Sequence, residues 1–435
     1  MTDRVNTREL ILEILLQVTR EQEYSHIAIR GVLDKYRYLP KQDRAFILRV
    51  SEGTLERLIE MDYMINQVSK TKVNKMKSVI RNILRMGVYQ LKYMDAVPDR
   101  AACNEAVKLA VRKGFGGLKG FVNGVMRNIS RNLSQLHFPD PDKNPLEYLS
   151  VQYSVPMWLA EKWTTDYGYE NARQSFESFL APSVTSVRTN LTLTTPEKLK
   201  AQLLAEGVTV LENPRVDYGM FLFGYDTLDS LPSFREGKFY VQDTASMLAV
   251  EQAEVSENNY VIDVCAAPGG KSAHMAEKLM GTGMVEARDL TPYKVELIEE
   301  NIRRCRLANM RAVCQDALKP DPDSMEKADI VIADLPCSGL GVIGRKPDIK
   351  YRMKPETMEE LAALQRQILS VVHNYVKPGG MLLYSTCTVN PQENEENAGW
   401  FEKTYPQFRL LAMEQTFPDR FTDGFFTAKF KKENI

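Results

Sequence analysis

The sequence predicts a multidomain protein, with an all-α N-terminal bundle, a small α+β middle unit and a C-terminal α/β domain of Rossmann-like type. Three observations support this fold class. Apolar residues recur with the 3.6-residue period of helices through residues 4–135. Residues 136–147 lose that period and contain three prolines. From residue 236 onward, strand-like and helix-like segments alternate, which indicates a parallel sheet covered by helices on both faces.

The N-terminal segment is predicted to form a compact bundle of six to eight helices. Its first helix places Leu10, Ile14 and Val18 on one face, and later helices centre on Ile83 and Val125. Short interruptions separate the helices, at Gly31 and at residues 38–40, 96–98 and 114–117.

The overall net charge of −1 conceals an asymmetry. Residues 1–135 carry 24 Lys and Arg against 14 Asp and Glu, and residues 70–131 carry 14 basic residues against three acidic ones. This imbalance favours a polyanionic partner, although a solvated helical surface would have the same composition. Arg8, Asp43-Arg44 and Ser51–Leu55, taken in order, resemble the NusB-like helical domain. That resemblance implies RNA binding.

Several classes of protein are disfavoured by composition. The chain lacks the apolar run of about 18 residues that a membrane span requires. It shows no apolar signal core near its N-terminus, so we expect a cytoplasmic protein. The six cysteines lack CxxC spacing and there are four histidines, which argues against a metal site and against a disulfide framework. We expect a monomer with no membrane partner.

The middle unit, residues 146–235, is predicted to be small and RRM-like. Helices are expected at 155–163 and 169–180, and a third at 195–206 begins with Thr195-Pro196. Strands are expected at 184–190, 208–211 and 220–223. We therefore predict three domains, at residues 1–138, 146–235 and 236–435.

The C-terminal domain is predicted from its strands and helices in order. Strands are expected at 260–264, 284–287, 311–314, 330–333, 381–384 and 424–430. Helices are expected at 271–280, 291–307, 355–375 and 391–404.

The first of these strands ends in a glycine turn, Ala266-Ala-Pro-Gly-Gly270, followed by Lys271-Ser272. A strand, a tight turn and a helix N-terminus form a common site for anionic or nucleotide-like ligands. A Walker A phosphate loop is the rival interpretation. Its leading glycine would fall at Cys265, which disfavours a triphosphate ligand.

Acidic residues follow four consecutive predicted strands, at Asp263, Asp289, Asp316 and Asp334. A single Asp at such a place is often a helix cap, but four in register predict a shared acidic rim. Asp289 lies 19 residues after Gly270, where a carboxylate accepts hydrogen bonds from ribose hydroxyls. Asp316 is placed to accept from an adenine amino group. The rim suits the sulfonium nucleoside S-adenosylmethionine and would repel a pyrophosphate.

Two cysteines follow neighbouring strand ends, Cys337 in Asp334-Leu-Pro-Cys-Ser-Gly and Cys387 in Ser385-Thr-Cys-Thr. Converging strand ends would bring both thiols to one pocket. Carbon 5 of a pyrimidine becomes nucleophilic when a thiolate adds to carbon 6, and a carboxyl group such as Asp334 near ring nitrogen 3 would assist that addition. The residues alone do not rank the two thiols. Cys265 is expected to line the glycine turn, and small buried roles are expected for the others, Cys103, Cys305 and Cys314.

These motifs, with a Gly424-Phe-Phe-Thr-Ala stretch, resemble the signature of the Sun/RsmB-type RNA (cytosine-5) methyltransferases over residues 148–430. The resemblance implies that Cys387 is the nucleophile, that Cys337 assists product release and that Lys271 contacts the target base. Ser272 and Arg288 depart from the common family pattern, and Arg288 is expected to alter the ribose side slightly. The implied cofactor positions are Cys265, Ala266, Ala267, Pro268, Gly269, Gly270, Lys271, Asp289, Asp316 and Asp334.

A NusB-like domain joined to such a catalytic domain resembles the branch of this family that acts on bacterial 16S rRNA. The resemblance therefore predicts transfer of a methyl group from S-adenosylmethionine to carbon 5 of one 16S rRNA cytosine. Two alternatives remain from sequence. One is a transfer RNA cytosine-5 methyltransferase, which would share every catalytic residue. The other is an RNA-binding assembly factor with a vestigial methyltransferase fold.

Overall fold

The computed structural model describes residues 5–182 and 184–434. The chain divides into two compact units. The first extends to Leu180 and also contains Ile343–Arg352, a segment from the C-terminal half of the sequence. The second comprises Ala181–Val342 and the chain from Met353 onward. The predicted domain boundaries at 138, 146 and 235 stay predictions.

The first unit is helical, as predicted. Asn6 begins it by accepting hydrogen bonds from the backbone N–H groups of Arg8 and Glu9, at 3.0 and 3.2 Å. The expected interruption at Gly31 is wrong, because Gly31 lies inside α2, where one exposed glycine costs about 1 kcal/mol and does not end a helix. The described α-helices of this part are α1 (Thr7–Thr19), α2 (Ser25–Lys35), α3 (Lys41–Glu56), α4 (Leu58–Val68), α5 (Ser78–Tyr93), α6 (Asp99–Arg112) and α7 (Lys119–Asn132). They are followed by α8 (Pro145–Gln152), α9 (Met157–Tyr167) and α10 (Tyr169–Ser178).

The basic character of this unit lies on its surface. Four lysines around the short helix η1 (Val73–Lys75) are exposed: Lys70, Lys72, Lys75 and Lys77. The apolar faces point inward, with Ile14, Ile83 and Val125 in one continuous core. The sequence periodicity therefore identified the buried faces of these helices correctly.

A segment that the sequence did not place, α16 (Ile349–Arg352), packs within the helical unit. Its Lys350 is 1% exposed and donates a hydrogen bond to the backbone carbonyl of Glu56 at 2.8 Å. Burial lowers the pKa of the Lys350 ammonium to about 7, against the opposing charge of Glu56. The Tyr351 hydroxyl lies 3.2 Å from the backbone carbonyl of Ser154. These contacts hold α16 within the helical unit.

The second unit begins with a four-stranded antiparallel sheet in the order β2-β3-β1-β4. β4 lies after residue 235 and pairs with β1. On β1, the buried Arg188 forms an ion pair with Glu277 of α14, which links the small sheet to the helix after the glycine turn. The elements are β1 (Thr185–Thr189), α11 (Pro196–Ala205), β2 (Thr209–Glu212), β3 (Gly219–Phe223), α12 (Pro232–Arg235) and β4 (Phe239–Val241).

The larger sheet has seven strands in the order β10-β11-β9-β8-β5-β6-β7. The five strands from β9 to β7 are parallel, and β11 runs antiparallel to both of its neighbours, β9 and β10. The sheet is therefore mixed and is not parallel throughout as the alternation of strands and helices indicated. β10 is not predicted from sequence because it is an edge strand with mostly exposed residues, and it lacks the apolar run of a central strand. The strands are β5 (Tyr260–Asp263), β6 (Met284–Asp289), β7 (Met310–Cys314), β8 (Ala328–Asp334), β9 (Val376–Thr386), β10 (Phe408–Thr416) and β11 (Phe425–Lys432).

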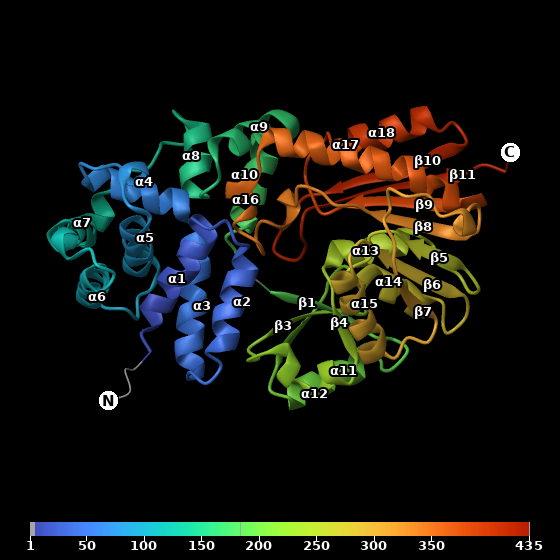
Figure 1. The fold of residues 1–435 in the computed structure, drawn as a ribbon, viewed down its shortest axis with the longest axis horizontal. Coiled ribbons are helices and arrows are strands. Elements are labelled where there is room, and N and C mark those ends of the chain that lie inside the picture. The colour runs from blue at the N-terminus through green and yellow to red at the C-terminus, as the bar shows by residue number, and fades with distance from the viewer. Residues whose placement is uncertain (1–4, 183, 435) are drawn as a thin grey trace. The chain divides into compact units, whose positions relative to one another are not determined.

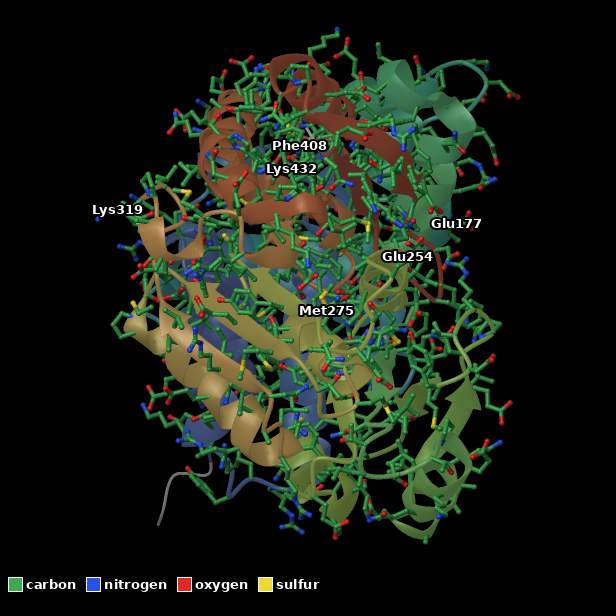
Figure 2. The ribbon with its side chains drawn as sticks, turned by 90° about the vertical axis from the view of Figure 1, so that its right-hand side faces the viewer. Glu177, Glu254, Met275, Lys319, Phe408 and Lys432 are labelled. Carbon is green, nitrogen blue, oxygen red and sulfur yellow. The ribbon has the colours of Figure 1, made fainter. Side chains whose placement is uncertain are left out.

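Helices cover both faces of this sheet (Figure 1). On one face, Val331 packs in a core with residues of α17 and α18, and on the other, Ile332 packs with residues of α13, α14 and α15. Phe408 belongs to the first core and Met275 to the second, and both are labelled in Figure 2. The helices are α13 (Thr244–Gln252), α14 (Gly270–Lys278), α15 (Pro292–Cys305), α17 (Pro355–Val372) and α18 (Glu395–Thr404).

None of the helices in residues 5–182 and 184–434 has the length and apolar character needed to cross a bilayer. Within the same ranges, His, Cys, Asp and Glu side chains do not form a group of three or more that could hold a metal ion.

Candidate active site

The glycine turn connects β5 to α14 and is held from three sides. Its backbone N–H at Ala266 donates to the carbonyl of Arg288 at 2.8 Å, and the N–H of Ala267 donates to Asp289 Oδ2 at 2.9 Å. The Tyr240 hydroxyl donates to the carbonyl of Pro268 at 2.9 Å. Gly269 has φ +101°, in the left-handed region that favours glycine. The end of β6 therefore fixes the shape of the turn.

The four predicted acids lie along one edge of the sheet. Because β8, β5, β6 and β7 are neighbours in that order and parallel, Asp334, Asp263, Asp289 and Asp316 follow one another across the rim. Asp289 is 3% exposed and forms an ion pair with Lys294 at 3.0 Å. Asp316 lies beyond the end of β7 and is half-buried. The rim has the acceptor-rich chemistry that ribose hydroxyls and a cationic ligand require.

Burial governs the ionisation of the innermost acid. Asp263 is 1% exposed, and burial raises the pKa of its carboxyl group to about 7, despite a hydrogen bond of 2.5 Å from the Ser272 hydroxyl. The Ser272 hydroxyl thus binds the buried Asp263 carboxyl group directly. Burial also raises the pKa of the Cys265 thiol, and the charges of Asp263 and Asp289 raise it further. Cys265 therefore stays a neutral thiol and lines the turn.

The two candidate catalytic thiols are neighbours. Cys337 lies three residues after β8 and Cys387 directly follows β9, and their Sγ atoms are 3.4 Å apart. Both side chains are half-buried. Their mutual hydrogen bond and burial raise the pKa of the Cys337 thiol well above its ordinary value. Cys337 is therefore held as a protonated thiol.

Lys271 and Asp334 form the polar pair beside these thiols. Lys271 Nζ donates to Asp334 Oδ2 at 2.6 Å, and the Ser385 hydroxyl donates to Oδ1 at 2.8 Å. Burial alone would lower the pKa of the Lys271 ammonium, but the charges of Asp334, Asp263 and Cys387 raise it above its ordinary value. Lys271 is thus a fixed cation between the turn and the cysteines, with its Nζ 4.9 Å from the centre of the Phe425 ring.

Three residues that help to build this site are not predicted from sequence: Ser385, Phe425 and Tyr240. Ser385 pairs in register with Asp334 across β8 and β9. Once β8 and β9 are known to be neighbours, the position of Ser385 at the end of β9 predicts that it lies beside Asp334. Phe425 lies in the Gly424-Phe-Phe-Thr-Ala stretch, so the family resemblance marks its segment, although no role was predicted for its side chain. Tyr240 carries no comparable signal, because it reaches the site from a strand whose pairing the sequence does not specify.

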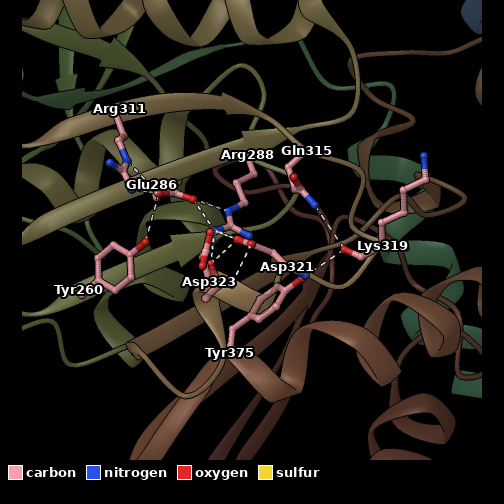
Figure 3. A network of polar contacts seen from close by, with 10 residues as sticks. Tyr260, Glu286, Arg288, Arg311, Gln315, Lys319, Asp321, Asp323 and Tyr375 are labelled. Atoms are coloured by element: carbon pink, nitrogen blue, oxygen red, sulfur yellow. Dashed lines mark hydrogen bonds and ion pairs between the residues drawn. The ribbon is translucent and has the colours of Figure 1, made fainter.

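Arg288 does not alter the ribose side of the rim through its side chain. Side chains alternate across a strand, so Arg288 points away from Asp289. Its Nε donates to Glu286 Oε1 at 2.6 Å, and one of its Nη atoms lies 3.0 Å from Asp321 (Figure 3). Arg311 and Tyr260 also bind Glu286. This network supports the underside of β6.

The expectations for the remaining cysteines are met in two cases. Cys103 and Cys305 are buried, as predicted. The expectation for Cys314 is wrong, because Cys314 is exposed. It ends β7, the edge strand of the sheet, which pairs with β6 on one side only.

Comparison with known proteins supports the fold and the family. The family described as "16S rRNA methyltransferase RsmB/F" matches residues 250–431. The NusB family matches residues 5–131, and the RsmF/B-like ferredoxin-like domain matches residues 155–224. A "Probable ribosomal RNA small subunit methyltransferase B" of Bacillus subtilis (strain 168) is 34% identical over 99% of both chains.

The chain belongs to the ribosomal RNA small subunit methyltransferase B family. A relative of that name from Vibrio cholerae is 28% identical over 99% of this chain and 98% of its own. The crystal structure of PH0851 superimposes with a TM-score of 0.82, with 26% identity, over 99% of both chains. Membership confirms the predicted NusB-like bundle, the small α+β unit and the Rossmann-like methyltransferase domain. Membership of a methyltransferase family agrees with the predicted cofactor, S-adenosylmethionine.

Proposed function

We propose that this chain transfers a methyl group from S-adenosylmethionine to carbon 5 of a cytosine in 16S rRNA through a covalent adduct on Cys387. The observation that carries this proposal is the pair of thiols 3.4 Å apart, next to the Lys271–Asp334 pair. A nitrogen or oxygen acceptor needs no covalent activation. A pyrimidine carbon 5 does, because it becomes nucleophilic when a thiolate adds to carbon 6.

The residues divide the steps of this reaction among them. The Cys387 thiol loses its proton to water, and the thiolate sulfur then bonds to carbon 6. The electron pair of the 5,6 double bond moves toward carbon 5 and the conjugated ring edge. The Lys271 ammonium, held by Asp334, lies where it can offset the negative charge that develops on the ring. An ammonium near a thiol also favours the thiolate form that the addition requires.

The bound S-adenosylmethionine supplies an electrophilic methyl group for carbon 5. A base then takes the carbon 5 proton, the 5,6 double bond re-forms, and the bond between carbon 6 and Cys387 sulfur breaks. Cys337 lies beside Cys387, with the two Sγ atoms 3.4 Å apart, where its thiol can move a proton during product release. This agrees with the roles that the family resemblance implies for the two cysteines.

The residues proposed to hold the cofactor are those of the glycine turn, Cys265 to Lys271, together with Asp289, Asp316 and Asp334. The chemistry of this donor set fits the ligand. Asp289 offers a buried carboxylate to ribose hydroxyls, and the rim as a whole attracts a sulfonium cation. A left-handed glycine at position 269 keeps the turn free of side-chain volume.

The surface lysines of the helical unit support an RNA substrate, because clustered cations bind phosphates with an affinity that salt weakens. The target cytosine must be unpaired or flipped out of its stack, at a cost of a few kcal/mol. The descriptions of the matching family and of the relatives favour the small ribosomal subunit RNA.

Bisulfite sequencing of ribosomal and transfer RNA, with and without this gene, tests the proposal. We expect one 16S rRNA cytosine to lose its protection from bisulfite conversion when the gene is deleted. The wild-type gene should restore that protection, and the Cys387→Ala gene should not. Loss of protection in a transfer RNA instead would establish the alternative substrate. Unchanged protection in both RNAs would refute the proposed reaction.

A further inference from the structure

Glu393 is a fully buried carboxylate beside the two cysteine loops, and neither the proposed reaction nor the family resemblance gives it a role. It lies six residues after Cys387, just before the start of α18. A buried carboxylate is costly unless hydrogen bonds satisfy it, so its retention in a core position calls for a physical reason.

Four donors satisfy this carboxylate. Oε2 accepts from the backbone N–H of Ser338 at 2.9 Å and from Gln365 Nε2 at 3.0 Å. Oε1 accepts from Asn390 Nδ2 at 2.9 Å and from the Ser338 hydroxyl. Two of the four bonds therefore come from Ser338, the residue that directly follows Cys337. Glu393 holds the Cys337 loop by its backbone.

The same network extends to the second cysteine loop. The Ser338 and Thr388 hydroxyl oxygens are 2.7 Å apart, and Thr388 directly follows Cys387. Thr388 Oγ1 also accepts from the backbone N–H of Leu340 at 3.2 Å. The carbonyl of Cys387 accepts from the N–H of Gly341 at 3.2 Å. The two loops are thus joined directly behind the thiols.

Gln365 anchors this arrangement to α17. Its Nε2 donates both to Glu393 and to the carbonyl of Pro336, the residue before Cys337, at 2.9 Å. Its Oε1 accepts from Tyr384 at 3.1 Å and from Asn397 at 2.8 Å. The Cys337 loop is therefore fixed on both sides of the thiol, to β9, α17 and α18.

We propose that Glu393 is a positioning residue, which sets the distance between the Cys337 and Cys387 thiols through Ser338 and Thr388. The proposal rests on the proposed covalent reaction. The negative charge of Glu393 has a second effect. The Cys387 hydrogen bond and burial contribute most to the raised pKa of the Cys337 thiol, and the Glu393 charge raises that pKa further. Glu393 therefore helps to keep Cys337 protonated.

Glu393→Gln tests the proposal with little change of volume. In the variant, one carboxylate oxygen becomes an amide nitrogen, which donates hydrogen bonds and does not accept them. The groups that now donate to that oxygen would meet another donor, and the Ser338 backbone would shift. A shift of about 1 Å at a catalytic group can slow a reaction ~100-fold. We expect Glu393→Gln to slow single-turnover methyl transfer by ~10- to 100-fold, with cofactor affinity unchanged within about twofold.

Two further readouts separate positioning from general damage. The pH profile of Cys337 alkylation by iodoacetamide, followed by peptide mass spectrometry, should move to lower pH in Glu393→Gln, because a negative charge is removed. Glu393→Asp keeps the charge but shortens the reach, so its methyl transfer should slow while its alkylation profile stays near that of the wild type. Glu396→Gln, at an exposed position on α18, is the matched control and should behave as the wild type.

Thr388→Val gives an independent test if Glu393→Gln does not fold. It removes the hydroxyl that joins the two loops and should slow methyl transfer while leaving cofactor binding intact. Wild-type transfer rates and alkylation profiles in folded Glu393→Gln, or a wild-type transfer rate in Thr388→Val, would overturn the positioning role. Failure of the covalent reaction itself would show separately, as normal turnover in Cys387→Ala.

Discussion

Lys271→Met removes the cation that is proposed to offset charge on the target base. In the structure, Lys271 Nζ is 2.6 Å from Asp334 Oδ2, and the two side chains are 11% and 28% exposed. A hydrogen bond between charged groups contributes ~1.5–3 kcal/mol. If a bond of that strength forms to the ring as the thiolate adds, its removal slows adduct formation by ~10- to 150-fold, since about 1.4 kcal/mol corresponds to tenfold in rate.

The assay is single-turnover formation of the covalent RNA–protein adduct in the Cys337→Ala background, at saturating S-adenosylmethionine, with quenching in denaturant. Saturation separates the chemical effect from weaker cofactor binding. Lys278→Met is the matched control, because Lys278 lies on the same helix and binds Glu251 at 2.7 Å, away from the thiols. Adduct formation by Lys271→Met at the Lys278→Met rate would refute the assigned role of Lys271.

Three other predictions follow from the structure. Arg188→Met leaves Glu277 buried without its cation, and should lower the free energy of unfolding by ~3–5 kcal/mol in urea titrations, whereas Arg188→Met/Glu277→Leu should recover most of it. Burial raises the pKa of Asp263 to about 7, so its carboxyl group loses its proton as the pH rises through that value. Affinity for the cationic cofactor should therefore rise about tenfold between pH 6 and 8. Asp263→Asn should abolish that rise. Replacement of four surface lysines by Gln should make RNA binding less sensitive to salt. In filter binding, the slope of log affinity against log salt concentration should become shallower by up to ~0.9 for each phosphate that is no longer neutralised. An unchanged slope would exclude this surface as an RNA-binding site. These lysines are Lys70, Lys72, Lys75 and Lys77.

The sequence was sufficient to predict those parts of the site that follow directly from strand ends. Asp263, Asp289 and Asp334 each end a parallel strand, so their common rim follows from the alternation of strands and helices. Cys337 and Cys387 could be brought together by the same argument, because each follows a strand end.

What escaped prediction depends on contacts between distant segments. Ser385 faces Asp334 only because β8 and β9 are adjacent and in register, which a single sequence does not specify. Glu393 is one acid among three glutamates near the start of a helix, a pattern that is typical of a solvated helix terminus. The segment with Lys350 lies in a polar stretch after the Cys337 loop, and its burial depends on an acceptor in α3. Long-range packing, and not local propensity, decides each of these cases.

A denaturing gel measures the covalent role of Cys387 directly. Cys337→Ala, incubated with S-adenosylmethionine and 16S rRNA, is predicted to accumulate an RNA–protein adduct that survives denaturing electrophoresis. Cys337→Ala/Cys387→Ala should form no adduct, although its cofactor binding should be intact. An adduct of equal yield in the double variant, or normal methyl transfer by Cys387→Ala alone, would contradict the account.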